Sequence, residues 1–279
     1  MTVSKANASG ARSKAQSGAQ SNKAKIARRV IEVLDYFDDS HREATVMDIV
    51  RRYQRPQSST SELLSSLVEL GLLEKDAHAR TYRLTPRAAM IGTGSQSGVV
   101  RDGRLVRLVD RLVAQTGLSV AVVGMVGLKA QIVSWRSGAR GPVRGLHGGM
   151  LEALHESAAG WLLLSTIAQQ RCDGVLRRLN AEAADDAKFS TDDMALRIQA
   201  ARDTREAAGP AGFGSTAQLA AVLLPADASD VPLVVAFAFG PQDRVNPQAL
   251  TACIHEAVRL ELAPETSAPV TLELVQSAA

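Results

Sequence analysis

The chain has 279 residues, of which 46% are hydrophobic and 22% charged, and these values predict one large or two ordinary globular domains. They exclude a wholly disordered, collagen-like or coiled-coil chain, and no apolar run approaches the roughly 18 residues of a membrane helix. Two cysteines cannot form a disulfide framework or a cysteine-based zinc site. The first 95 residues carry a net charge of +5 and the remainder −2, so a nucleic-acid contact or a solvated basic tail is expected in the first part.

The first part of the chain divides into a polar segment and a helical segment. Residues 1–22 are rich in Ser, Ala, Gly and Lys, cannot bury enough surface to fold alone, and predict a mobile basic arm. Apolar residues from Ile26 to Phe37 then recur at helical spacing. Thr45 and Asp48 form the pattern of a capping box, which predicts the start of a second helix.

A third helix and a hairpin follow. Ser58 or Ser59 can cap a helix that runs to about Leu70, and Gly71 stands where a helix C-terminal glycine is expected. Three short helices and a hairpin are typical of a winged helix-turn-helix domain, which we expect over residues 23–91. The predicted hairpin strands are Leu72–Lys75 and Thr81–Leu84.

The remaining residues predict a second domain. A Gly/Ser-rich stretch indicates a linker over residues 92–101, followed by a domain over 102–263 and a tail over 264–279. Strands separated by helices favour an α/β arrangement there, and the whole chain is expected to be α+β. The predicted elements are a helix over Asp102–Thr116, strands over Ser119–Val126 and Ala130–Arg136, helices over Ser157–Gln169, Asp173–Asn180 and Asp192–Ala207 (capped by Thr191), strands over Gln218–Leu224 and Leu233–Phe239, and a helix over Pro247–Leu262.

The third helix of the first domain has a polar side that can read DNA. At 100° per residue, leucines and Thr60 fall on one side, and serines and glutamates on the other. Because the first turns of a recognition helix meet base edges, we predict that Ser61 and Glu62 set the sequence preference. A merely solvated surface is the alternative, but the basic flanks and the hairpin favour DNA. The candidate DNA-binding residues are Gln57, Ser58, Ser59, Ser61, Glu62, Ser65, Arg28, Arg51, Arg52, Arg55 and Arg80.

These segments resemble the IclR family of bacterial transcriptional regulators. Pro56–Leu64 and Leu67–Glu74 look like that family's recognition helix and entry to the wing, and Tyr82–Arg87 looks like the wing exit. The resemblance covers about residues 25–262. It implies a GAF-like effector-binding domain, a cytoplasmic and nucleoid-associated bacterial location, and a homodimer or dimer of dimers on a pseudo-palindromic operator. The looser matches in the second domain are Leu154–Trp161, Arg202–Gly209 and Phe237–Pro241.

The resemblance also implies a pocket for a small organic or aromatic acid, between a curved sheet and the helix predicted at 157–169. For Ser157 plain helix capping is the alternative, and for the two tryptophans and Phe237 it is core packing. The chain departs from the family in having Trp161 where Lys is common and a shorter segment around Ser215. The candidate effector-binding residues are Trp135, His155, Ser157, Trp161, Phe213, Ser215 and Phe237.

Two functions remain open. Zinc-protease, dinucleotide-binding and nucleophile-elbow motifs are absent from the sequence, so we expect no enzyme, no cofactor and no metal site. The first hypothesis is a ligand-responsive repressor or activator. The second is a constitutive DNA-binding or protein-interaction factor whose sensor pocket has decayed, and the short segment around Ser215 keeps it open.

Overall fold

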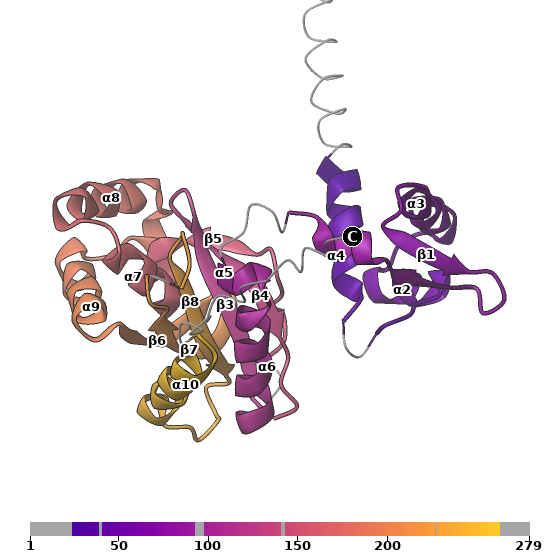
Figure 1. Ribbon diagram of the computed structural model, residues 1–279. Helices are drawn as coiled ribbons and strands as arrows, with labels where there is room; N and C mark the ends of the chain where they lie inside the picture. Colours follow the sequence, from indigo (N-terminus) through magenta and orange to yellow (C-terminus); the bar gives the residue numbers. More distant parts are fainter. Residues whose placement is uncertain (1–23, 39–40, 93–97, 141–142, 227, 263–279) are drawn as a thin grey trace, which may run out of the picture. The chain divides into compact units, whose positions relative to one another are not determined.

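A computed structural model describes residues 24–38, 41–92, 98–140, 143–226 and 228–262. The chain divides into two compact units, residues 1–95 and 96–279 (Figure 1). The predicted arm (1–22) and tail (264–279) lie outside the described residues. Within the described ranges, no helix is long and apolar enough to cross a membrane.

The first unit contains the three helices and the hairpin that the sequence predicts. Thr45 caps α2: its Oγ1 accepts from the Asp48 amide at 3.3 Å, and Asp48 Oδ2 accepts from the Thr45 amide at 2.8 Å, so the capping box is confirmed. The hydrogen bonds from Thr45 hold the pKa of Asp48 below its usual value. The elements are a helix over residues 24–36, α2 (Val46–Tyr53), α3 (Gln57–Glu69), β1 (Leu73–Asp76), β2 (Thr81–Leu84) and α4 (Pro86–Met90).

The two ends of α3 differ in how they are closed. At the C-terminal end the Gly71 amide donates to Val68 O and the Leu72 amide to Leu67 O, both at 2.9 Å. This is a Schellman motif, and it requires the left-handed φ of +71° that Gly71 adopts. At the N-terminal end the cap residue is Pro56, which offers no side-chain hydrogen bond. The expectation that Ser58 or Ser59 caps this helix is therefore wrong, because the helix starts before both.

A small apolar core joins these elements. Val33, Ile49, Leu64 and Leu67 are buried together, one or two from each helix. The β1–β2 hairpin, which forms the wing, is joined to the segment before α2 by an antiparallel bridge between Ala44 and Tyr82. The amides of these two residues donate to each other's carbonyl oxygens at 3.0 and 2.8 Å. Ile26, predicted to lie on the buried face of the first helix, is 57% exposed.

The second unit is built on a six-stranded sheet in the order β5-β4-β3-β8-β7-β6, antiparallel throughout. Its GAF-like α/β arrangement agrees with the predicted fold class. The elements are α5 (Gly98–Arg101), α6 (Arg104–Thr116), β3 (Ser119–Val126), β4 (Lys129–Arg136), β5 (Leu151–Ala153), η2 (Leu154–Glu156), α7 (Ala158–Ser165), α8 (Gln169–Glu182), η3 (Asp185–Ala187), α9 (Thr191–Thr204), β6 (Glu206–Gly212), β7 (Ser215–Leu223), β8 (Leu233–Phe239) and α10 (Pro247–Glu261).

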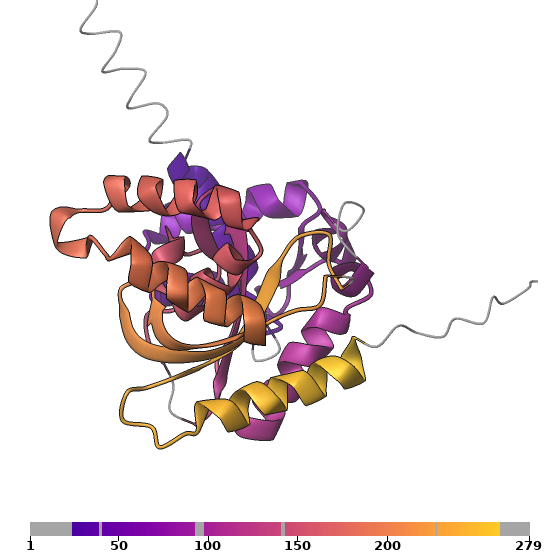
Figure 2. The ribbon, with the colours of Figure 1, turned by 90° about the vertical axis from the view of Figure 1, so that its left-hand side faces the viewer.

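Helices cover both faces of this sheet. Because side chains alternate along a strand, Val235 and Phe237 of β8 pack toward α6 and α10, whereas Val234 and Ala236 pack toward α7, α8 and α9. Figure 2 shows the curled sheet between the α8–α9 pair and the α6–α10 pair. Small alanines on the α7 side let this entirely buried helix approach the strands closely.

Two strands and one cap differ from the sequence expectation. The helix predicted over Asp192–Ala207 ends at Thr204, and β6 follows as an edge strand containing Pro210, which is tolerated there because an edge strand leaves one side unpaired. β5 lies in a stretch to which no element was assigned from the sequence. α9 is capped by Ser190, whose Oγ accepts from the Asp193 amide at 3.2 Å, and not by Thr191.

Candidate nucleic-acid interface and effector site

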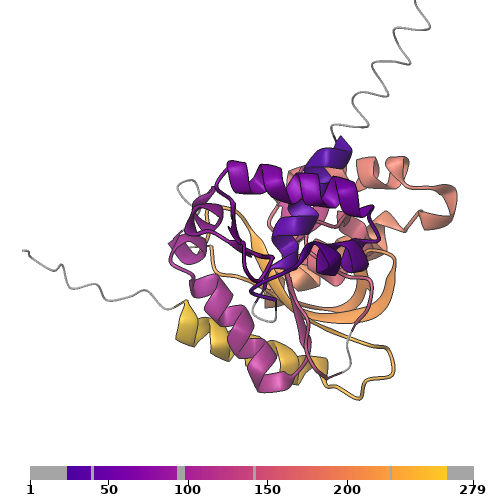
Figure 3. The same cartoon turned by 90° about the vertical axis from the view of Figure 1, so that its right-hand side faces the viewer.

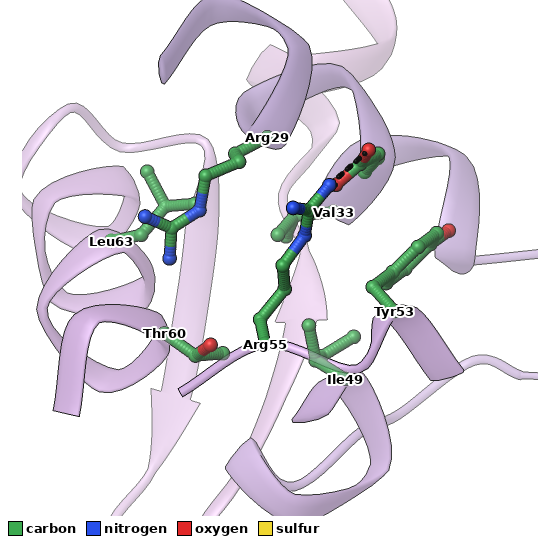
Figure 4. Close-up of a pocket in the computed structure, with 8 residues that line it drawn as sticks. Arg29, Val33, Ile49, Tyr53, Arg55, Thr60 and Leu63 are labelled. Carbon is green, nitrogen blue, oxygen red and sulfur yellow. Dashed lines mark hydrogen bonds and ion pairs between the residues drawn. The ribbon is translucent and has the colours of Figure 1, made fainter. Parts of the chain in front are cut away.

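The first helix holds α3 and the turn before it. Arg29 Nη2 donates to Ser59 Oγ at 3.0 Å, and Arg55 Nη2 donates to both carboxylate oxygens of Glu32 at 2.9 and 3.1 Å. Figure 4 shows these two arginines over a pocket whose floor includes Val33 and Ile49 of the core, with the Arg55–Glu32 pair dashed. The start of α3 is therefore fixed by charged contacts above the apolar core.

The side of α3 away from the core carries small polar and acidic groups. Gln57, Ser58, Glu62 and Ser65 are exposed, and Ser61 is half-buried. Figure 3 shows α3 at the surface of the first unit. Thr60 is buried, and its hydroxyl donates to Pro56 O at 2.9 Å, as its predicted position on the leucine side requires. The structure thus places the predicted reading residues on one accessible face.

The N-terminus of α3 is suited to an anion. Its first-turn amides lack a side-chain cap, and the exposed Ser58 hydroxyl stands in that turn. Unsatisfied amides and the positive end of the helix dipole together attract phosphate. The start of α3 can therefore bind an anionic group such as a phosphate.

The predicted arginines fall into two groups. Arg28, Arg51, Arg52 and Arg80 are exposed. Arg55 is half-buried and engaged by Glu32. Ser59 is likewise engaged, by Arg29, so these two predicted contacts hold the helices together in this structure. The sequence could not reveal this, because the contacts join residues 23 and 30 positions apart.

The wing carries one uncompensated arginine at its turn. Asp76 Oδ1 accepts from the amides of His78 and Ala79 at 2.8 and 2.9 Å, which lowers the pKa of Asp76 and orders the turn. Arg80 follows with a left-handed φ of 56° and is exposed. Arg83, by contrast, pairs with Glu74 on the opposite strand at 3.1 Å. Of these two arginines, only Arg83 has its charge balanced by a carboxylate on the neighbouring strand.

In the second unit, several predicted effector residues gather around η2 and the start of α7. Ser157 caps α7, accepting from the Gly160 amide at 3.2 Å. Trp161 Nε1 donates to His155 O at 2.9 Å, and the guanidinium of Arg197 lies 4.9 Å from the Trp161 ring centre. The buried His155 ring stacks on Phe189 at 4.5 Å. Burial lowers the pKa of His155, so the imidazole is neutral at pH 7.

Sequence reasoning did not identify Glu152, which contacts one of the predicted effector residues. Its Oε2 accepts from the Phe213 amide. The carboxylate occupies the space that a Cβ on Gly212 would need, next to the Gly212–Ser215 pair of the β6–β7 turn. Burial raises the pKa of Glu152 to about 7. Glu152 thereby connects β5 and β6, the two edge strands of the sheet.

The remaining predicted effector residues lie apart from this group. Phe237 is fully buried on the opposite face of the sheet, among residues of α6 and α10, so its assignment to the pocket is wrong. Trp135 is half-buried and donates to Ser137 Oγ at 3.1 Å. Ser215 Oγ accepts from the Ala217 amide at 3.1 Å. Within the described parts of the chain, no three His, Cys, Asp or Glu side chains are placed to share a metal ion.

Comparison with solved structures establishes the fold. An IclR transcriptional regulator from Alicyclobacillus acidocaldarius is 18% identical, with 86% of this chain and 95% of that chain covered and a TM-score of 0.52. An IclR homolog from Microbacterium hydrocarbonoxydans, complexed with 4-hydroxybenzoate, is 18% identical, with coverages of 85% and 98% and a TM-score of 0.51. The Thermotoga maritima IclR is 12% identical, with coverages of 85% and 96% and a TM-score of 0.52.

A family model gives the more specific finding. Residues 27–77 match the IclR helix-turn-helix domain, a span that includes α2, α3 and the first strand of the wing. The search of curated proteins found no match. The resemblance to the IclR family is therefore confirmed over these residues, which match the IclR helix-turn-helix domain.

Proposed function

We propose that the protein is a cytoplasmic transcriptional regulator that inserts α3 into the major groove of a pseudo-palindromic operator. The observation that carries this proposal is the accessible polar face of α3, with an uncapped N-terminus held in place by Arg29 and Arg55. The amides and Ser58 contact phosphate, and Ser61 and Glu62 contact base edges. A single reading helix covers few base pairs, so a homodimer or a dimer of dimers supplies the second half-site.

We further propose that a small molecule bound by the second unit changes operator affinity. The support is the group of buried polar side chains around η2 and the start of α7, in a chain that shares the fold of a relative solved with 4-hydroxybenzoate. A ligand alters DNA affinity only by binding one arrangement of the two units better than another. Such couplings change affinity by about 5- to 150-fold.

Selection from a random DNA pool with the full-length protein tests the DNA-reading part. The expected result is an enriched sequence with two-fold symmetry, and asymmetric enrichment would remove the dimer from the proposal. Repeating the selection with Glu62→Gln should change the preferred base at one position in each half-site. Glu69→Gln is the matched control, because Glu69 is also exposed but lies in the last turn of the same helix. The proposal fails if both variants select the wild-type sequence.

A second candidate is a constitutive DNA-binding factor. The tight β6–β7 turn favours it, since Gly212 pairs with Ser215 across only two intervening residues and leaves little loop for a ligand. The two candidates differ in one measurement, operator affinity with and without a small molecule that raises the melting temperature. An unchanged affinity for every such molecule favours the constitutive factor.

A further inference from the structure

The carboxylate of Glu152 has one satisfied and one unsatisfied oxygen. Oε2 accepts from the Phe213 amide, whereas Oε1 is buried and has no hydrogen-bond partner among the described residues. The whole residue is 7% exposed. Buried polar atoms are normally paired, and an isolated buried charge is more costly still, so an unpaired carboxylate oxygen inside a binding domain indicates a ligand contact.

Among the described residues, the groups that act on the Glu152 carboxylate include no cation. Glu156, an acidic neighbour, disfavours its ionisation. His155 is neutral, because burial lowers the pKa of its imidazole. The nearby guanidinium of Arg197 lies over the ring of Trp161. An anionic ligand placed at Oε1 would add like charge to this site, whereas an ammonium would supply both the missing charge and the missing donor.

The groups that hold the carboxylate also fix its direction. Phe213 and its two glycine neighbours all adopt left-handed φ angles, of 75°, 53° and 68° for Gly212, Phe213 and Gly214, which turns the Phe213 amide toward β5. Phe213 was expected from the sequence to contact the effector, so its hydrogen bond joins Glu152 to the same site.

We propose that Glu152 is the specificity-determining residue of the effector site and that the effector binds it through a protonated amine. This inference rests on the effector-binding part of the proposed function and names its ligand class. It differs from the organic or aromatic acid that the family resemblance implies. The ammonium donates to Oε1, while the Phe213 amide keeps the carboxylate in place.

Three probes that share a phenyl ring and differ in head-group charge test this proposal: benzylamine, benzyl alcohol and benzoate. With the full-length protein we expect a saturable rise in melting temperature with benzylamine, a smaller rise with benzyl alcohol and none with benzoate. Glu152→Gln keeps an acceptor for the Phe213 amide but removes the charge, so it should weaken benzylamine binding by about tenfold or more. Glu182→Gln is the matched control, because it removes an exposed carboxylate of the same unit that pairs with Arg178, and it should change binding less than about threefold.

The possible results distinguish a failure of the amine proposal from a failure of the proposed regulatory function. The amine proposal is overturned if benzoate binds as well as benzylamine, if none of the three probes binds, or if Glu152→Gln binds benzylamine like the wild type. Benzoate binding that also changes operator affinity would overturn the amine proposal alone and leave the ligand-responsive regulator standing. Failure to select any operator would instead contradict the proposed function, whichever probe binds.

Discussion

The two units place their polar residues in opposite ways. Among the described residues, the first unit buries one polar side chain, Thr60, and keeps its charged groups at or near the surface. The second unit buries both an acid and a histidine, Glu152 and His155, along with several hydroxyls. DNA attracts exposed positive charge over a distance, whereas a small molecule is distinguished by a few enclosed groups of fixed direction. The contrast agrees with the proposal that the first unit binds DNA and the second a small molecule.

The distribution of aromatic residues allows the unfolding of each unit to be measured separately. All three tyrosines, Tyr36, Tyr53 and Tyr82, belong to the first unit, and both tryptophans, Trp135 and Trp161, belong to the second. Tryptophan emission therefore reports on the second unit, and tyrosine absorbance reports on the first. Unfolding experiments can follow the two units separately in the intact chain.

The largest effect is expected from Gly160→Ala. A Cβ at this position would overlap the backbone carbonyl of Leu154, which cannot rotate away as a flexible side chain could. We expect the second unit to lose about 3 kcal/mol or more of unfolding free energy, as in overpacked cores. Urea unfolding followed by tryptophan emission measures this loss, and the tyrosine signal should be unchanged.

Gly174→Ala is the control for that prediction. Gly174 is an exposed residue inside α8, and a Cβ there meets no atom within 4 Å. Alanine in a helix interior is favoured over glycine by about 0.5–1 kcal/mol, so this variant should be slightly more stable than the wild type. Equal destabilisation by both substitutions would contradict the close η2–α7 packing.

The second-largest expected effect is the pH dependence of the unfolding free energy of the second unit. The folded pKa of Glu152 is about 7, against an ordinary value of 4.5, so between these values the folded state binds more protons than the unfolded state. The unfolding free energy contributed by Glu152 therefore falls as pH rises from about 4.5 to 7, by about 3 kcal/mol at most. His155 acts in the opposite direction, because its lowered pKa costs stability as pH falls through 6.5.

Comparing the wild type with Glu152→Gln separates the pH dependence of stability due to Glu152 from that due to His155. Relative to wild type, the variant should gain stability between pH 4.5 and pH 8, and tryptophan-monitored urea unfolding at the two pH values measures the gain. Glu156→Gln is the control and should show a much smaller change, because Glu156 is largely exposed. A pH-independent difference for Glu152→Gln would show that the carboxylate titrates normally.

The contrast between the units also explains what the sequence could predict. The polar face of α3 and the capping box of α2 depend on spacing within one element, so periodicity located them correctly, and the strands Ser119–Val126 and Leu233–Phe239 have the predicted bounds. The contact of Glu152 with the Phe213 amide joins residues 61 positions apart, which no local pattern in the sequence shows. Pro210 in β6 reads locally as a strand breaker, and only its position at the sheet edge makes it acceptable.

Two helix caps, one in each unit, test whether the two units unfold independently. Thr45 caps α2 in the first unit and Ser190 caps α9 in the second, each accepting from the amide three residues on. Removing such a cap costs about 1 kcal/mol. Thr45→Ala should therefore shift only the tyrosine-monitored transition, and Ser190→Ala only the tryptophan-monitored one. A shift of both transitions by either variant would show that the units unfold as one.

The smallest effect distinguishes two arginines of the wing. Arg80 stands exposed at the hairpin turn, whereas the charge of Arg83 is balanced by Glu74 across the strands. Each phosphate contact that releases a counterion contributes about 1 to the slope of log affinity against log salt. Arg80→Ala should reduce the slope by about 1 and weaken binding to all sequences alike, because a phosphate contact reads no base. Arg83→Ala should leave the slope within about 0.3 of the wild type, since it removes a charge that is already paired. Titration of the selected operator from 50 to 200 mM salt measures both slopes. Equal slopes for the two variants would mean that the wing does not contact the backbone through Arg80, and the phosphate contacts would then have to come from α2 and the start of α3.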